Sequence, residues 1–213
     1  MKLYIFDLDG VLVDSKKTME IAWEECRRVH DIESLNLNGS NSFESYFLHI
    51  GQPFEDIMQK LGIHASIAEI KKTYIETSLA NIEETKPYDG VFETLERIDA
   101  KKAIVTSKPI ATTNKILENW PIKFDSVVCP CDHPSGIQHY RGKPAPDMLL
   151  NVVSRLNEDP ADCVYIGDTQ IDQQAANRAG IHFYYADYGY GTSGRYLKHE
   201  KCSRILTSIT QLI

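Results

Sequence analysis

The chain has 213 residues, of which 42% are hydrophobic and 25% are charged, and its formal net charge is −7 at pH 7. This length can bury one core with an insertion, or two small domains, and the acidic balance argues against a nucleic-acid or membrane-surface partner. No apolar run approaches the roughly 20 residues that span a bilayer, and five cysteines without a CxxC pair argue against a disulfide framework. We therefore expect a cytoplasmic protein, monomeric or homodimeric, that binds neither nucleic acid nor membrane.

Two carboxylates follow the first predicted strand. The apolar run over residues 2–6 leads directly into Asp7 and Asp9, and Gly10 permits the sharp turn that comes next. The carboxyl ends of strands in a parallel α/β sheet border the ligand crevice, and residues two apart on a strand share a face. Such carboxylates repel each other unless a cation lies between them or one is protonated. The pair therefore predicts a Mg²⁺ site.

The next part of the chain, residues 16–86, carries helical patterns without an alternating strand pattern between them. Apolar residues recur at helical spacing over 16–30, 43–49, 53–61 and 65–80, with a break at 36–42. We therefore predict an all-helical insertion over 16–86, which would form a cap if its two short linkers, near Ser15 and Pro87, allow it to close over a substrate.

From residue 87 onward, predicted helices and strands alternate. The helices are expected over 91–98, 111–120, 144–156 and 170–179, and the strands over 103–105, 124–128, 163–166 and 181–185. This alternation is typical of βαβ units. We predict an α/β fold: a Rossmann-like parallel sheet core, built from residues 1–15 and 87–213, with helices on both faces and the inserted helical cap.

Further polar groups are expected at the same edge of the sheet. Thr106 and Ser107 end one strand, Lys143 precedes a helix, and Asp168 ends a later strand with Asp172 one helical turn beyond it. A phosphoryl group repels an anionic nucleophile, so its site must combine a carboxylate with a divalent cation, a fixed ammonium group and neutral hydrogen-bond donors. The sequence supplies carboxylates that could hold such a cation, hydroxyl groups and a lysine at these positions.

The stretch from Asp7 to Ser15, DLDGVLVDS, resembles the first motif of the haloacid dehalogenase-like superfamily, DxDG[TV]xxDS. The strand ending in Thr106, the KPAPD stretch that contains Lys143 and the GDTQID stretch that begins at Gly167 resemble the other three motifs. GQP at 51–53, followed by Leu61-Gly62, resembles the helical cap of phosphoglycolate-phosphatase-like and β-phosphoglucomutase-like members.

This resemblance implies a role for each site residue. Asp7 would be the nucleophile that forms an aspartyl phosphate, and Asp9 would be the general acid and base. Thr106, Ser107 and Lys143 would bind the phosphate, and Lys143 would also neutralise charge on the nucleophile. The ligands of Mg²⁺ would be the Asp7 carboxylate, the Asp9 main-chain carbonyl and Asp168, while Asp172 would either ligate through water or orient Lys143.

The leading interpretation is a Mg²⁺-dependent phosphatase of a small phosphorylated metabolite. Two alternatives are a phosphomutase of the β-phosphoglucomutase type, which would use the same aspartyl phosphate, and a non-catalytic binding protein that keeps the fold. A haloacid dehalogenase is disfavoured by Asp9, because cleavage of a carbon–halogen bond needs neither Mg²⁺ nor an acid for the leaving group. Which phosphorylated compound is the substrate stays open at this point.

Two further patterns are weaker. Residues 189–194 match GxGxxG but follow the strand at 181–185, which we expect to be the last of the sheet, whereas a dinucleotide fingerprint opens the helix of a βαβ unit. Cys129, Cys131, His133 and His139 have ligand types that suit Zn²⁺, but their order differs from that of zinc loops in related phosphatases. An ordinary loop with reduced thiols is the preferred interpretation.

Overall fold

The computed structural model describes residues 1–32, 41–130, 140–191 and 202–213. Within them lies a six-stranded parallel sheet in the order β5-β4-β1-β6-β7-β8. The strands are β1 (Leu3–Phe6), β4 (Lys101–Val105), β5 (Ser126–Val128), β6 (Cys163–Gly167), β7 (His182–Ala186) and β8 (Arg204–Leu206). The predicted parallel α/β core is confirmed.

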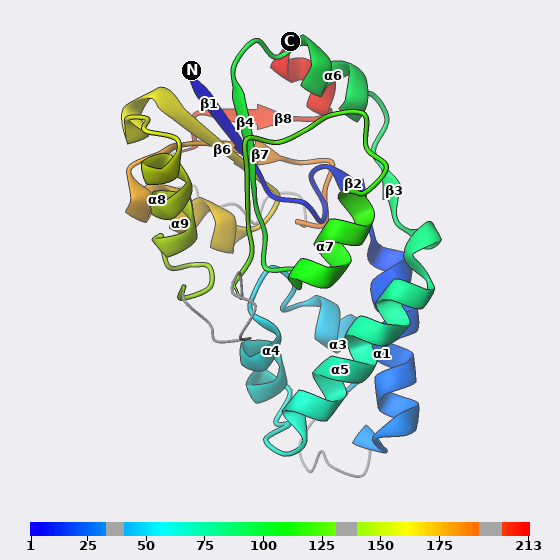
Figure 1. Ribbon diagram of the computed structural model, residues 1–213. Helices are drawn as coiled ribbons and strands as arrows, with labels where there is room; N and C mark the ends of the chain where they lie inside the picture. The colour runs from blue at the N-terminus through cyan, green and yellow to red at the C-terminus, as the bar shows by residue number, and fades with distance from the viewer. Residues whose placement is uncertain (33–40, 131–139, 192–201) are drawn as a thin grey trace.

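Helices cover both faces of this sheet because the strands are apolar on both sides. In β1, Leu3 and Ile5 belong to the apolar cluster that contains the buried residues of α8 (Asp147–Arg155) and α9 (Gln170–Ala179). Phe6 belongs to the cluster on the other face, with α6 (Val91–Arg97) and the short 3₁₀ helix η3 (Ile209–Leu212). Figure 1 shows α8 and α9 on one side of the sheet and α6 on the other.

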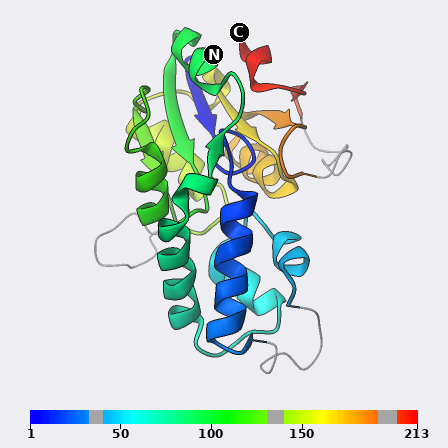
Figure 2. The same ribbon diagram turned by 90° about the vertical axis from the view of Figure 1, so that its right-hand side faces the viewer.

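The predicted helices over 16–86 form a group of their own below the sheet (Figures 1 and 2). They are α1 (Lys16–Val29), α3 (Phe43–Phe47), α4 (Phe54–Lys60) and α5 (Ile67–Ala80), followed by the 3₁₀ helix η1 (Ile82–Glu84). α1 and α5 run side by side, and the group has its own apolar cluster, centred on the fully buried Trp23. We call residues 16–86 the helical segment.

The chain enters and leaves the helical segment through two very short strands. β2 (Val13–Asp14) pairs antiparallel with β3 (Lys86–Pro87). The two linkers therefore lie side by side between the sheet and the helices, whereas both termini lie at the opposite end of the sheet (Figure 1). None of the helices in the described ranges is both long enough and apolar enough to cross a membrane.

Among the predictions that differ from the structure are two helix boundaries and the position of the last strand. Helix α7 (Ile110–Leu117) ends three residues before the predicted 120, because Pro121 disfavours helical dihedrals at the residue before it. Helix α8 begins at Asp147 instead of 144, since Pro146 imposes the same restriction upstream. The expectation that the strand near 181–185 ends the sheet was wrong, because β8 pairs in parallel with β7 beyond it.

Candidate active site

Three neighbouring strands deliver the polar groups of the site. Asp7, Thr106 and Asp168 each follow directly on β1, β4 and β6, which are adjacent in the sheet. The ladder continues one residue beyond β1, because the Asp7 amide donates to the Ile166 carbonyl over 2.9 Å. The structure therefore brings these three predicted site residues together at the carboxyl edge of the sheet.

Lys143 is the buried ammonium group of the site. Its Nζ lies 3.0 Å from Asp7 Oδ2 and 2.7 Å from Asp172 Oδ1, and the residue is 1% exposed. Burial acts to lower the pKa of Lys143, but the carboxylates of Asp172 and Asp7 outweigh this effect and raise the pKa above its ordinary value. Lys143 therefore stays charged and is held beside the predicted nucleophile.

Asp172 has hydrogen-bond donors on both of its carboxylate oxygens. Oδ1 accepts from Lys143 and, over 2.9 Å, from the Tyr165 hydroxyl, which lies 3.2 Å from Lys143 Nζ. Oδ2 accepts from the Thr169 amide over 3.1 Å and from its hydroxyl, and the Thr169 side chain caps α9 in return. Of the two roles that the sequence left open for Asp172, this geometry corresponds to the orientation of Lys143.

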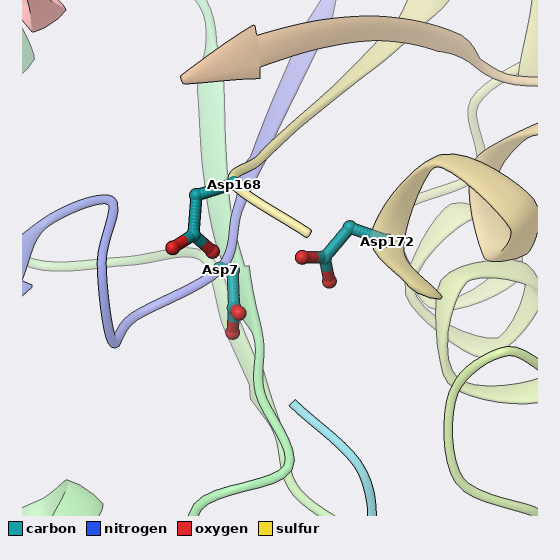
Figure 3. Close-up of side chains that lie close together, drawn as sticks. All are labelled: Asp7, Asp168 and Asp172. Atoms are coloured by element: carbon teal, nitrogen blue, oxygen red, sulfur yellow. The ribbon is translucent and has the colours of Figure 1, made fainter. Parts of the chain in front are cut away.

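A cluster of buried carboxylates can hold a metal ion. Asp7, Asp168 and Asp172 each offer one oxygen, and these atoms lie within 4.8 Å of one another. Figure 3 shows the three side chains converging from the end of β1, the end of β6 and the first turn of α9. Hard divalent cations such as Mg²⁺ prefer ligands of this kind.

Asp168 is the member of the cluster that most needs a cation. Its Oδ2 accepts a hydrogen bond from the Tyr190 amide over 2.7 Å, but its buried Oδ1 has no hydrogen-bond partner among the described residues. Burial, reinforced by the charges of Asp172 and Asp7, raises the pKa of Asp168 well above its usual range. Burial is also the main reason that the pKa of Asp7 rises to about 7. A bound cation would supply the missing partner and relieve this repulsion, so the residues fit a divalent metal.

The Asp9 carboxylate points to a different set of partners. Its Oδ1 accepts from the Ser15 hydroxyl over 2.5 Å and from Lys108 Nζ over 2.9 Å, while Lys108 lies 3.2 Å from Oδ2. The Asp9 side chain is therefore not part of the acid cluster. Any contact between Asp9 and a metal would therefore be made by its main-chain carbonyl, which is the atom that the sequence prediction assigns to Mg²⁺.

A small cavity of about 50 Å³ connects these groups to the helical segment. From the sheet edge it is lined by Asp7, Asp9, Thr106, Ser107, Lys108, Pro109, Thr112, Asp168 and Thr169, and Tyr190 also contributes. Helices α1, α3, α4 and α5 supply the opposite wall. The Ser107 hydroxyl donates to the Gly51 carbonyl over 2.6 Å, so one predicted phosphate-binding residue instead holds the helical segment in this structure.

Two residues of the site received no role in the sequence analysis. Lys108 follows Thr106 and Ser107 directly, so its position beside a predicted strand end was an available signal. Tyr190 lies in the GxGxxG match at 189–194, which was discounted as a dinucleotide fingerprint. Its amide binds Asp168, its hydroxyl accepts from the Ser15 amide and donates to Asp14, and its ring centroid lies 5.1 Å from that of Phe47. Tyr190 thus contacts the metal-site acid, the linker and the helical segment at once.

Gly10 and the glycines on either side of Tyr190 allow this close packing. Gly10 has φ +79, and a Cβ atom there would collide with the Asp168 carboxylate. Cβ atoms at Gly189 and Gly191 would also collide with Asp168. The described part of the GxGxxG match, residues 189–191, therefore packs against the acid site, and residues 192–194 lie outside the described residues.

The zinc alternative concerns a neighbouring loop. Cys129 is buried, and its thiol lies 3.7 Å from the Thr113 hydroxyl. Cys131, His133 and His139 lie outside the described residues.

A parallel sheet whose carboxyl edge gathers buried carboxylates, a buried lysine and hydroxyl groups is an arrangement typical of α/β enzymes. Residues 4–186 match the family model for haloacid dehalogenase-like hydrolases, and the chain belongs to that family. The family resemblance of the four sequence motifs is thus confirmed.

Curated relatives point to one kind of reaction. The chain is 29% identical to a phosphoglycolate phosphatase of Aquifex aeolicus, over 89% of this chain and 86% of the relative. It is 31% identical to a phosphorylated carbohydrates phosphatase of Thermotoga maritima, over 87% and 84%. A haloacid dehalogenase-like hydrolase from Bacteroides fragilis has the same fold, with a TM-score of 0.82, 23% identity and coverage of 100% and 99%. The protein is a phosphatase of this family, a phosphoric monoester hydrolase.

Proposed function

We propose that the protein is a Mg²⁺-dependent phosphatase that hydrolyses a small phosphorylated metabolite through an aspartyl phosphate on Asp7. The observation that carries this proposal is the buried pair of Asp7 and Lys143, whose charged atoms lie 3.0 Å apart at the end of the central strand. A carboxylate held there is poised to attack, and the adjacent ammonium group offsets the charge that an incoming phosphoryl group brings.

In the first step an Asp7 oxygen forms a bond to phosphorus while the bond from phosphorus to the leaving oxygen breaks. Asp9 donates a proton to that oxygen, so the product leaves as an alcohol. In the second step Asp9, now a carboxylate, takes a proton from water as the water oxygen attacks phosphorus. Inorganic phosphate then departs and Asp7 is regenerated. Ser15 and Lys108, which bind the Asp9 carboxylate, would orient it for both proton transfers.

Asp7, Asp168 and the Asp9 carbonyl would hold Mg²⁺, with Asp172 fixing Lys143 beside them. When bound, the metal would supply electrostatic stabilisation of the phosphoryl oxygens. The buried and unpartnered Asp168 Oδ1 supports this assignment. The Thr106 hydroxyl, with neighbouring backbone amides and Lys143, would bind the remaining phosphoryl oxygens.

We further propose that residues 16–86 act as a cap over a catalytic core formed by residues 1–15 and 87–213. The cavity of about 50 Å³ lies between the two parts and is lined by both, so movement of one part against the other would widen the space for a substrate. The adjacent linkers β2 and β3 are suited to act as the hinge. Names of relatives, which include phosphoglycolate, fructose 1-phosphate and phosphorylated carbohydrates, support a small metabolite as substrate.

The test is a phosphate-release screen over a panel of phosphorylated metabolites, with Mg²⁺ and with EDTA. We expect release that requires Mg²⁺ and falls by several orders of magnitude in Asp7→Asn. Asp56→Asn is the matched control, because it makes the same substitution at an exposed residue of α4. Full activity of Asp7→Asn would rule out Asp7 as the nucleophile, and isomer formation with little free phosphate would indicate a mutase.

A further inference from the structure

The wall that the helical segment contributes to the cavity is electrically neutral. Its apolar members include Met19, Phe54 and Ile57, and its hydroxyl groups belong to Tyr46, Tyr74 and Ser78. Among the described residues that line the cavity, Lys108 is the one with a cationic side chain, and it comes from the sheet edge. The part of the substrate that faces the helical segment therefore meets rings, aliphatic groups and hydroxyl groups.

The tyrosine hydroxyls of this wall remain protonated. Tyr46 and Tyr74 are 3% and 6% exposed, and burial is the main cause that raises the pKa of each above its ordinary value. The charge of Asp9 contributes in the same direction for both residues. Its field therefore reaches this wall, which stays neutral and retains hydrogen-bond donors.

The opposite side of the cavity already has its charges matched. Four buried or partly buried carboxylates, those of Asp7, Asp9, Asp168 and Asp172, surround the site, and Lys108 and Lys143 are each paired with one or two of them. A bound phosphoryl group adds its own negative charge, so no cation among the described residues that line this cavity is left over for a second anion.

From this distribution we propose that the cavity selects phosphate esters whose leaving group is a small, uncharged alcohol or polyol. It would reject esters whose leaving group carries a carboxylate. A carboxylate against the neutral wall would be desolvated without a cationic partner, whereas hydroxyl groups can pair with Tyr46, Tyr74 and Ser78. The inference rests on the proposed phosphatase function and specifies its substrate class.

The direct test compares two esters of the same chain length. 2-Phosphoglycolate and 2-hydroxyethyl phosphate differ in having a carboxylate or a hydroxymethyl group at the same position. We expect kcat/KM for 2-hydroxyethyl phosphate to exceed that for 2-phosphoglycolate by at least about tenfold. Equal values, or a preference for 2-phosphoglycolate, would overturn this inference and leave the proposed phosphatase function standing. Phosphate release from neither ester, with Mg²⁺ present, would count against both.

A cation placed in the wall should change this selectivity. Gln52 lines the cavity just before α4, while Gln59 is exposed on the same helix. We expect Gln52→Lys to shift the ratio of the two kcat/KM values toward 2-phosphoglycolate by about tenfold or more, and Gln59→Lys, which adds the same charge outside the cavity, to keep the parent ratio. A ratio in Gln52→Lys equal to that of the parent would contradict the electrostatic argument, whatever the absolute rates.

Discussion

Replacing Asp7 by asparagine should change how the stability of the metal-free protein depends on pH. Burial raises the pKa of Asp7 from 3.8 to about 7, with help from Asp172 and Asp9 and against the effect of Lys143. For an acid whose pKa is raised by folding, the stability it contributes is complete below the unfolded value and is lost as pH rises through the folded value. The difference between the unfolded and folded pKa of Asp7 corresponds to about 4 kcal/mol of unfolding free energy. Roughly 3 kcal/mol of this stability is lost between about pH 5 and pH 8.

Urea unfolding in EDTA at these two pH values measures the effect. The variant Asp7→Asn has no charge to titrate, so its free energy of unfolding should fall by roughly 3 kcal/mol less than that of the parent over this interval. Asp168, whose pKa is also raised, titrates in both proteins. Because the Asp7 charge is one cause of that shift, the difference between the two profiles reports Asp7 together with its effect on Asp168. Excess Mg²⁺ should restore the stability of the parent most strongly at the higher pH, because it binds the folded protein and favours ionised carboxylates.

Parallel pH profiles for the parent and Asp7→Asn would refute the reasoning, because they would mean that Asp7 ionises in the folded protein as easily as in the unfolded chain. Asp56→Asn should follow the parent profile. The reasoning concerns the metal-free site. It would therefore also be contradicted if the unfolding free energy of Asp7→Asn depended less on pH than that of the parent only when Mg²⁺ is present.

Three other substitutions test separate parts of the site. Lys143→Met should lower the free energy of unfolding by about 3–5 kcal/mol, since it leaves two buried carboxylates without their ammonium partner. Urea unfolding that matches the parent would show that this pairing does not stabilise the folded protein. Gly10→Ala should weaken Mg²⁺ binding, because the Cβ of the alanine would displace the Asp168 carboxylate. The measurement is the Mg²⁺ concentration that gives half-maximal phosphate release. An unchanged Mg²⁺ requirement would argue against Asp168 as a ligand. Tyr190→Phe should cost about 1–2 kcal/mol of stability through the lost hydroxyl contacts. The Mg²⁺ requirement should stay unchanged, because the amide of residue 190 still binds Asp168. A higher Mg²⁺ concentration for half-maximal phosphate release would assign the hydroxyl a part in the metal site.

Much of the sheet edge could be predicted from the sequence because its signals are local. The turn at Gly10 follows an apolar strand and two acids within a few residues, so strand, turn and carboxylates are read together. Helix α9 has its predicted bounds, 170–179. In the structure Thr169 and Asp172 form a capping box at its start, and Gly180 adopts φ +71 at its end. Both patterns depend on neighbours in the chain, which the sequence contains directly.

The features that escaped prediction depend on contacts between distant segments. Strand β8 has three residues, two of them exposed, and so has no alternating pattern that separates it from a loop. Strands β2 and β3 have two residues each and exist because the two linkers meet. Tyr190 gained its place through Asp168, Ser15 and Phe47, which lie at least 22 positions away in the chain. No periodicity records such encounters.

Asp168 and Asp172 show why the chemistry of the acids also needed coordinates. One helical turn separates them in the same motif, so the sequence alone offers both to a metal. The difference lies in their donors. Lys143, Tyr165 and Thr169 bind the two oxygens of Asp172, whereas Asp168 Oδ1 is buried without a partner in the part of the chain that the structure describes. A buried carboxylate oxygen must be paired with a donor or a cation. Asp172 therefore serves to hold Lys143, whereas Asp168 is left open to a metal.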